Sequence, residues 1–197
     1  MSLRVEVPDG DLVATVLEVG GASWEPADLA ALWTRLGLSW SRKHDGYPAG
    51  RRFVLRPADP DRADGRPGGA FFVDFAVFLP PDDDPDGDEL AEDWDGPKWP
   101  LKRAAGRDEF DAACAQVVAL VTGRLGEPLL AGRDDDEEAP WMYALWRLPG
   151  TDRLAAVAQR DDIGMELGSL WVRDAPAGQP LPSPDEPFVD WLYRDAE

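Results

Sequence analysis

The stretch WMYALWRLPGTDRLAAVAQRDDIGMELGSLWVR, residues 141–173, decides the fold. In its first segment the even-numbered residues, Met142, Ala144, Trp146 and Leu148, are all apolar, and the other face carries Trp141, Tyr143, Leu145 and Arg147, a pattern that predicts a strand. Two short connections, 149–152 and 161–164, are rich in residues that form turns. Because strands joined by such short turns pair antiparallel, we expect a three-stranded meander. Its strands are predicted at 141–148, 153–160 and 165–173.

The segment before the meander, residues 107–125, has the periodicity of a helix. Asp108 is suited to cap its N-terminus, and Gly126 and Pro128 are residues that end helices. The apolar residues recur at intervals of three and four and form one stripe: Phe110, Cys114, Val117, Val121 and Leu125. This stripe predicts a helix that covers one apolar face of the meander. Cys114, the one cysteine of the chain, is expected in the core.

The N-terminal half has a looser version of this layout. Residues 70–79 are mostly apolar on both alternating faces, which predicts a central strand covered on both sides. Residues 25–36 carry a helical stripe that ends at Gly37. Residues 12–19 are rich in β-branched side chains and predict a strand, with a helix that begins at Asp11 as the alternative. Shorter strands are predicted at 3–7, 38–42, 51–56 and 129–131, a turn at 44–48, and a short C-terminal helix around Phe188, Trp191 and Leu192.

Together these elements predict an α+β fold, with helices packed on one face of one or more antiparallel sheets. A chain of 197 residues is expected to form a single domain, residues 1–197. The two longer predicted helices end in the same triplet, Arg-Leu-Gly, at 35–37 and 124–126. A further hypothesis is therefore a tandem duplication, with halves 1–79 and 107–197 joined by the acidic loop 80–106.

The chain has a formal net charge of −19, from 39 acidic and 20 basic residues. Such a surface repels the phosphates of nucleic acids and of anionic lipids, so we expect neither nucleic acid nor membrane binding. The first residues lack the apolar core of a signal peptide, and no apolar run approaches the ~18 residues of a membrane span. A cytoplasmic protein is therefore expected. Arginine greatly outnumbers lysine, a bias typical of high-GC bacterial genomes such as those of actinobacteria.

One acidic string resembles a calcium-binding loop. Asp82, Asp84 and Asp86 stand at its first, third and fifth positions, and Asp93 stands at the twelfth. Alternate oxygen ligands can wrap a hard cation, but the twelfth position has Asp instead of the longer Glu, and a strand instead of a helix is predicted to precede the string. We therefore favour a solvated acidic loop over a metal site, and we expect no cofactor.

Two residues are candidates for a pocket. His44, the one histidine, follows the predicted strand 38–42 and could act as a general base beside Asp45, although it stands in a turn and no nucleophile is identified for it. Asp74 interrupts an apolar strand, and a buried carboxylate needs a partner. One interpretation of Asp74 is structural, either an edge position or an ion pair with an arginine such as Arg52. The other interpretation is that its carboxylate is the acid of a pocket. No nucleotide loop, Gly-X-Ser-X-Gly motif or zinc spacing occurs in the chain.

Tryptophans beside acidic runs form a third kind of candidate. Trp94 and Trp99 lie in or next to the first run, whose nine carboxylates fall between Asp82 and Asp95. Each indole either packs on the body or stays available to a partner, and an acidic surround would attract a basic protein. The same two alternatives apply to the second run. It consists of Asp134, Asp135, Asp136, Glu137 and Glu138, followed by Trp141.

In composition and element order the chain resembles the immunity proteins of bacterial polymorphic-toxin systems, which are small, acidic and rich in tryptophan. Its layout is also similar to that of secretion-chaperone-like α+β domains. These resemblances imply a non-enzymatic protein whose acidic face masks a basic partner. The alternatives are a domain with a small-molecule pocket, which could be enzymatic, and a structural protein that self-associates through its sheet.

Overall fold

The computed structural model of the chain describes residues 2–50, 52–58, 69–79, 98–134, 141–162, 165–175, 180–182 and 187–193. Its helices are α1 (Gly10–Gly21), α2 (Pro26–Leu36), α4 (Arg107–Leu125) and α5 (Phe188–Tyr193). Its strands are β1 (Ser2–Val5), β2 (Tyr47–Ala49), β3 (Phe53–Pro57), β4 (Ala70–Leu79), β5 (Leu101–Arg103), β6 (Leu130–Arg133), β7 (Met142–Arg147), β8 (Arg153–Asp162) and β9 (Met165–Asp174).

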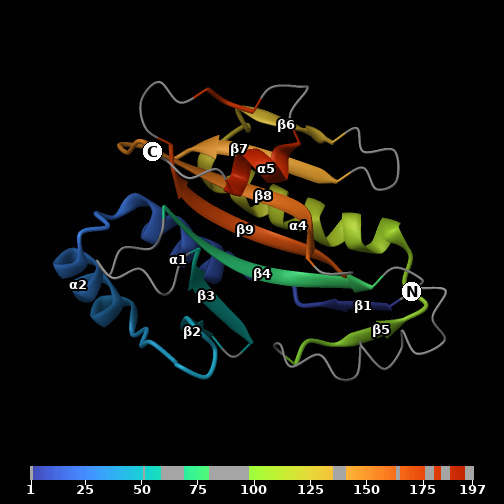
Figure 1. Cartoon of the computed structure of the whole chain (residues 1–197), viewed down its shortest axis with the longest axis horizontal. Coiled ribbons are helices and arrows are strands. Elements are labelled where there is room, and N and C mark those ends of the chain that lie inside the picture. Colours follow the sequence, from blue (N-terminus) through green and yellow to red (C-terminus); the bar gives the residue numbers. More distant parts are fainter. Residues whose placement is uncertain are drawn as a thin grey trace.

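The described strands form one antiparallel sheet, in the order β2-β3-β4-β9-β8-β7-β6 (Figure 1). β1 pairs with the second half of β4, and β5 pairs with β1. The expected α+β class is confirmed. Among the described residues, no helix is both long and apolar enough to cross a membrane.

The meander and its helix are confirmed. β7, β8 and β9 pair in sequence, and the even-numbered side chains of β7 lie in the core beneath the helices. α4 buries the predicted stripe from Phe110 to Val121. Its N-cap, however, is Gly106 and not Asp108. Cys114 is fully buried, as expected of a core residue, and this burial raises the pKa of its thiol to about 12.

The prediction of a strand at 12–19 was wrong. This segment belongs to α1, where Asp9 accepts a hydrogen bond at 2.8 Å from the Leu12 amide and caps the helix. The buried residues follow helical spacing, which outweighs the β preference of the valines. They are Leu12, Val13, Val16, Val19 and Gly20.

The prediction of a strand at 38–42 was also wrong, because only Ser41 makes a bridge there, to Gly46. The strand that precedes β3 and forms a hairpin with it is β2, which begins inside the predicted turn at 44–48. The predicted strands 51–56 and 129–131 correspond to β3 and β6.

β4 is the central strand that was predicted, but a bulge alters its faces. Asp74 pairs with Ser169 and Ala76 with Gly168, so Phe75 is an extra residue without a partner in the register. The alternation changes at this point. Phe71, Val73, Phe75 and Phe78 all join the core beneath the helices, whereas Val77 and Leu79 lie in a cluster on the other face.

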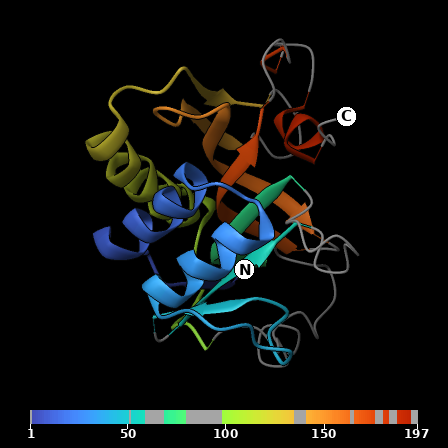
Figure 2. The ribbon, with the colours of Figure 1, turned by 90° about the vertical axis from the view of Figure 1, so that its left-hand side faces the viewer.

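The two faces of the sheet are covered differently (Figure 2). α1, α2 and α4 share one large core with the first face, and that core draws residues from both halves of the chain. The short C-terminal helix α5 packs on the opposite face, where Phe188, Trp191 and Leu192 are buried against β7, β8 and β9. Helices therefore lie mainly, but not solely, on one face.

Candidate functional site

Several described segments that flank the acidic runs meet at one end of the sheet. β4, β6 and β8 finish there and β7 and β9 begin there, because Phe78 and Asp161 both pair with Glu166, and Arg133 pairs with Met142. The N-terminus of α4 lies at the same end (Figure 1). We call this region the acidic end. The first acidic run follows β4 in the sequence, and the second run connects β6 to β7.

A network of side chains holds the acidic end together. Asp111 of α4 accepts hydrogen bonds from Gln159 at 2.8 Å, from Arg133 at 2.6 Å and from Arg107 at 3.2 Å. Burial by itself would raise the pKa of Asp111, but these three donors outweigh burial and lower the pKa. Gln159 is 1% exposed, and its carbonyl oxygen accepts from the Met142 amide at 2.7 Å.

Glu166 of β9 lies on the other side of Arg107. The Arg107 Nη1 atom is 2.6 Å from its carboxylate. Burial raises the pKa of Glu166, and neither Arg107 nor the nearby Trp141 fully offsets that rise. Arg107 therefore lies between two carboxylates whose pKa values shift in opposite directions. Sequence patterns did not single out this set, because its members come from four separate elements.

The structure places two predicted partner-binding residues within the body. Trp141 is half-buried. Asp134 accepts a hydrogen bond at 3.0 Å from the Phe188 amide, so its carboxylate binds the N-terminus of α5. Asp134 thus has a structural role.

Trp99 packs inside the protein, the first of its two alternatives, and is not displayed to a partner. It is 2% exposed, lies in a cluster with Val77 and Leu167, and donates from Nε1 to the Arg52 carbonyl at 2.7 Å. The remaining candidates of the two acidic runs lie outside the described residues. These are Trp94, Asp135, Asp136, Glu137 and Glu138, and the calcium-loop residues Asp82, Asp84, Asp86 and Asp93.

Asp74 is a structural carboxylate in a central strand, and its partner is not Arg52, which pairs with Glu6 instead. It accepts from Arg56 at 3.1 Å, from Arg160 at 3.3 Å and from the Ser169 hydroxyl at 2.5 Å. A carboxylate can accept about four hydrogen bonds, so these three donors occupy most of its acceptor sites. This arrangement favours the ion-pair alternative over the pocket acid.

His44 is exposed and stands in a turn. Its backbone carbonyl accepts from Arg56 Nε at 3.3 Å, so Arg56 connects the turn to Asp74. The two pocket candidates are therefore joined through a backbone group, and the imidazole takes no part in that contact. Among the described residues, no group of three or more His, Cys, Asp or Glu side chains could hold a metal ion.

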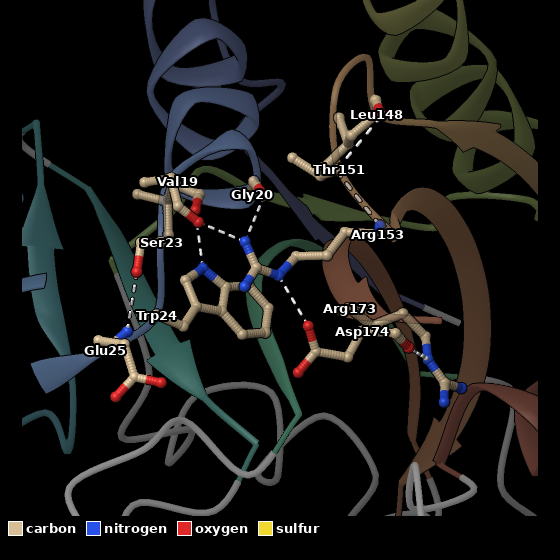
Figure 3. A network of polar contacts seen from close by, with 11 residues as sticks. Val19, Gly20, Ser23, Trp24, Glu25, Leu148, Thr151, Arg153, Arg173 and Asp174 are labelled. Carbon is tan, nitrogen blue, oxygen red and sulfur yellow. Dashed lines mark hydrogen bonds and ion pairs between the residues drawn. The ribbon is translucent and has the colours of Figure 1, made fainter. Parts of the chain in front are cut away.

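Sequence analysis also missed two arginines that connect helices to the sheet, Arg153 and Arg173, and Figure 3 shows the contacts of Arg153 at the end of α1. Arg153 of β8 donates to the Gly20 carbonyl at 3.1 Å and to the Ala22 carbonyl at the end of α1, and it pairs with Asp174 at 2.7 Å. Its guanidinium lies 3.9 Å from the centre of the Trp24 ring. Arg173 of β9 donates to the Trp191 and Leu192 carbonyls of α5. The signal in the sequence was an arginine at one end of an apolar strand: Arg153 is the first residue of β8, and Arg173 is next to the last residue of β9.

No protein-family model, curated protein or solved structure matches the chain.

Proposed function

We propose that the protein is a non-enzymatic binding protein, immunity-like or chaperone-like, whose acidic end masks a basic protein partner. The observation that carries the proposal is the formal net charge of −19 together with the attachment of both acidic runs at this end. Charge concentrated on one region speeds the encounter with an oppositely charged partner and orients it.

The basic residues near this end support the proposal, because described carboxylates already engage them. Arg107 pairs with Asp111 and Glu166, Arg133 pairs with Asp111, and Lys102 pairs with Glu109. These cations are therefore occupied within the fold. The exposed Asp108 and Asp161 add negative charge on either side of the network.

The polar chemistry inside the sheet also favours a binding protein over an enzyme. A pocket acid must be able to exchange a proton or bind a ligand, whereas Asp74 is engaged by Arg56, Arg160 and Ser169. Asp111 is engaged in the same way by Arg107, Gln159 and Arg133. Both networks join neighbouring elements, as expected of structural contacts.

The proposal is tested with two variants that carry the same change in charge. The run variant combines Asp135→Asn, Asp136→Asn, Glu137→Gln and Glu138→Gln, and it keeps Asp134 because that carboxylate binds α5. The control variant neutralises four exposed acidic residues elsewhere: Asp11, Asp28, Glu127 and Asp152. Each variant is immobilised, and basic proteins captured from a bacterial lysate are quantified by mass spectrometry.

We expect the run variant to lose at least ~10-fold of the captured basic protein and the control variant to retain it within ~2-fold. Equal losses in the two variants would show that total charge, and not the acidic end, attracts the partner. Equal retention by both variants and the wild type would contradict the proposal.

A further inference from the structure

A second surface, of opposite charge, lies at the β2 edge of the sheet. It is the turn from Trp40 to Gly46, which we call the basic tip. Arg42, Lys43 and His44 within it are the only three consecutive basic residues of the chain, and all three are exposed. β2 and β6 are the two ends of the main strand order, so the basic tip lies at the opposite edge of the sheet from β6.

The basic tip is held in one conformation. Ser41 and Gly46 exchange two backbone hydrogen bonds, at 2.8 and 3.4 Å, and the His44 amide donates to the Ser41 carbonyl at 3.1 Å. Asp45 has a φ of 46°, a left-handed conformation that is uncommon for residues other than glycine. At Gly46 a Cβ atom would lie 2.7 Å from the Leu55 carbonyl, so the turn packs directly on β3.

Trp40 gives the basic tip an apolar contact surface. Among the tryptophans that the structure describes it is the only exposed one, with 41% of its surface accessible. Its ring meets Tyr47 edge-on at 5.2 Å, and Tyr47 stacks on the buried Trp33 at 4.2 Å. A row of aromatic rings therefore fixes the exposed indole, which reduces the entropy lost when it is covered.

The charges of the basic tip differ from those of its surroundings. Three neighbouring arginines that the structure describes are paired, Arg35 with Glu18, Arg52 with Glu6 and Arg56 with Asp74. By contrast, no carboxylate within the described ranges pairs with Arg42 or Lys43. A protein with 39 acidic residues thus presents two adjacent cations without a described partner, beside a rigidly held tryptophan.

We propose that the basic tip is a docking site for a short acidic segment of a partner protein. A carboxylate of the segment pairs with Arg42 or Lys43, and an adjacent apolar side chain packs on Trp40. A short segment interacts within about one Debye length, roughly 8 Å in physiological salt, and so escapes repulsion by the rest of the surface. A long polyanion such as a nucleic acid would extend onto that repulsive surface. This site is independent of the proposed function at the acidic end.

The test uses the full chain and a fluorescein-labelled peptide of alternating glutamate and leucine, titrated by fluorescence anisotropy. We expect a Kd of about 100 μM or tighter, weakened at least ~5-fold by Trp40→Ala and by the double variant Arg42→Ser, Lys43→Ser. The control is the double variant Lys98→Ser, Arg147→Ser, which removes two exposed cations elsewhere and should leave the Kd within ~2-fold. Peptides in which glutamine replaces glutamate should bind more weakly.

A second measurement does not depend on any variant. Because His44 is the only histidine, its imidazole proton signals report on the basic tip without overlap from other histidines. These signals should shift on titration with the same peptide. The proposal is overturned if the wild type does not bind the peptide up to about 1 mM. It is also overturned if the variants bind like the wild type, if the His44 signals stay fixed, or if labelled oligothymidylate binds the basic tip more tightly than the peptide.

Discussion

Arg153 illustrates how single side chains fix the helices to the sheet. One guanidinium satisfies carbonyls at the end of α1, pairs with Asp174 of β9 and covers the Trp24 ring (Figure 3). The end of a helix leaves several carbonyls without intrahelical donors, and burial makes such groups costly. Arg153 therefore links two strands and a helix at the point where these carbonyls are covered.

Replacing this side chain should destabilise the protein. We expect Arg153→Ala to lower the free energy of unfolding by about 3 kcal/mol, because carbonyls of α1 lose their donor and Asp174 loses its partner. Urea denaturation followed by circular dichroism measures the change. Arg147→Ala, at an exposed position of the neighbouring strand, is the control and should alter stability by less than ~0.5 kcal/mol. Similar effects of the two substitutions would contradict the role of Arg153.

The carboxylate of Asp111 should make stability depend on pH. Its pKa in the folded protein is lowered from 3.8, so the folded state holds this proton less tightly than the unfolded state does. The stability that Asp111 contributes is therefore fully present above pH 3.8 and is lost as the pH falls through the lowered value. We expect Asp111→Asn to be less stable than the wild type near neutral pH, with the difference shrinking below pH 3.8.

Urea denaturation over a series of pH values measures this difference directly. The comparison with Asp111→Asn removes the general effect of neutralising the other carboxylates, which both proteins share. A difference in stability that stays constant, or that grows as the pH falls, would show that Asp111 is not stabilised by its three donors.

Among the elements, α1 and α4 contain glycines with opposite surroundings. A Cβ atom at Gly20 would lie 2.5 Å from Leu148 Cδ1 and 2.8 Å from Val172 Cγ1, whereas at Gly123 it would meet no atom within 4 Å. Alanine favours the helical backbone more than glycine does. We expect Gly123→Ala to raise the free energy of unfolding by about 0.5–1 kcal/mol.

At Gly20 the destabilising steric contact should outweigh the stabilisation that alanine gives to a helical backbone. We expect Gly20→Ala to lower the free energy of unfolding by about 1–3 kcal/mol, because α1 must move away from Leu148 and from Val172 of β9 to accommodate the methyl group. Urea denaturation measures the change in the free energy of unfolding for both variants. Stabilisation by both substitutions would mean that α1 does not approach the sheet as closely as described.

The elements also show what sequence patterns can and cannot predict. The strands of the meander were predictable because they are short apolar segments separated by turn residues, and because the even-numbered residues of the first segment are all apolar. α1 was mispredicted because Val13, Val16 and Val19 favour strands locally, whereas their burial follows a helical period. The bulge at Phe75 left no sequence signal, because an extra residue shows only in the pairing of β4 with β9.

Part of the candidate site was predictable for the same reasons. Asp74 stood out as a carboxylate in an apolar strand, and it does pair with arginines, as one of the two interpretations expected. The identity of its partners, Arg56 and Arg160 and not Arg52, depends on the register of β3 and β4 and on the long-range pairing of β4 with β9. The network around Arg107 depends on four elements, α4, β6, β8 and β9, that meet only in three dimensions.

At the scale of the whole molecule, the strand order is mirrored about its centre. β4 and β9 are the last strands of the two halves, and they pair antiparallel in the middle, with β3 and β2 on one side and β8 and β7 on the other. Such an order is compatible with the hypothesis of a tandem duplication, although among the described elements β1, β5, β6, α1 and α5 have no counterpart in this comparison. The duplication stays a prediction.

The shared core predicts that the two halves unfold together. Side chains of both halves, among them Phe75, Cys114 and Val172, belong to one cluster. We expect a single transition in urea, with far-ultraviolet circular dichroism and tryptophan fluorescence giving the same midpoint. Tryptophans report on both halves, since Trp24 and Trp33 lie in the first and Trp146 and Trp171 in the second. Two separated transitions would indicate independent halves.

The central claim is that the acidic end attracts a basic protein, and its most direct test is affinity capture from a bacterial lysate at two salt concentrations. Screening at about 0.5 M salt shortens the Debye length to roughly 4 Å and weakens attraction between exposed charges. The account predicts that the immobilised wild type retains a basic protein at low salt and releases it at high salt. Capture of no basic protein at either concentration, or retention unaffected by salt, would contradict it.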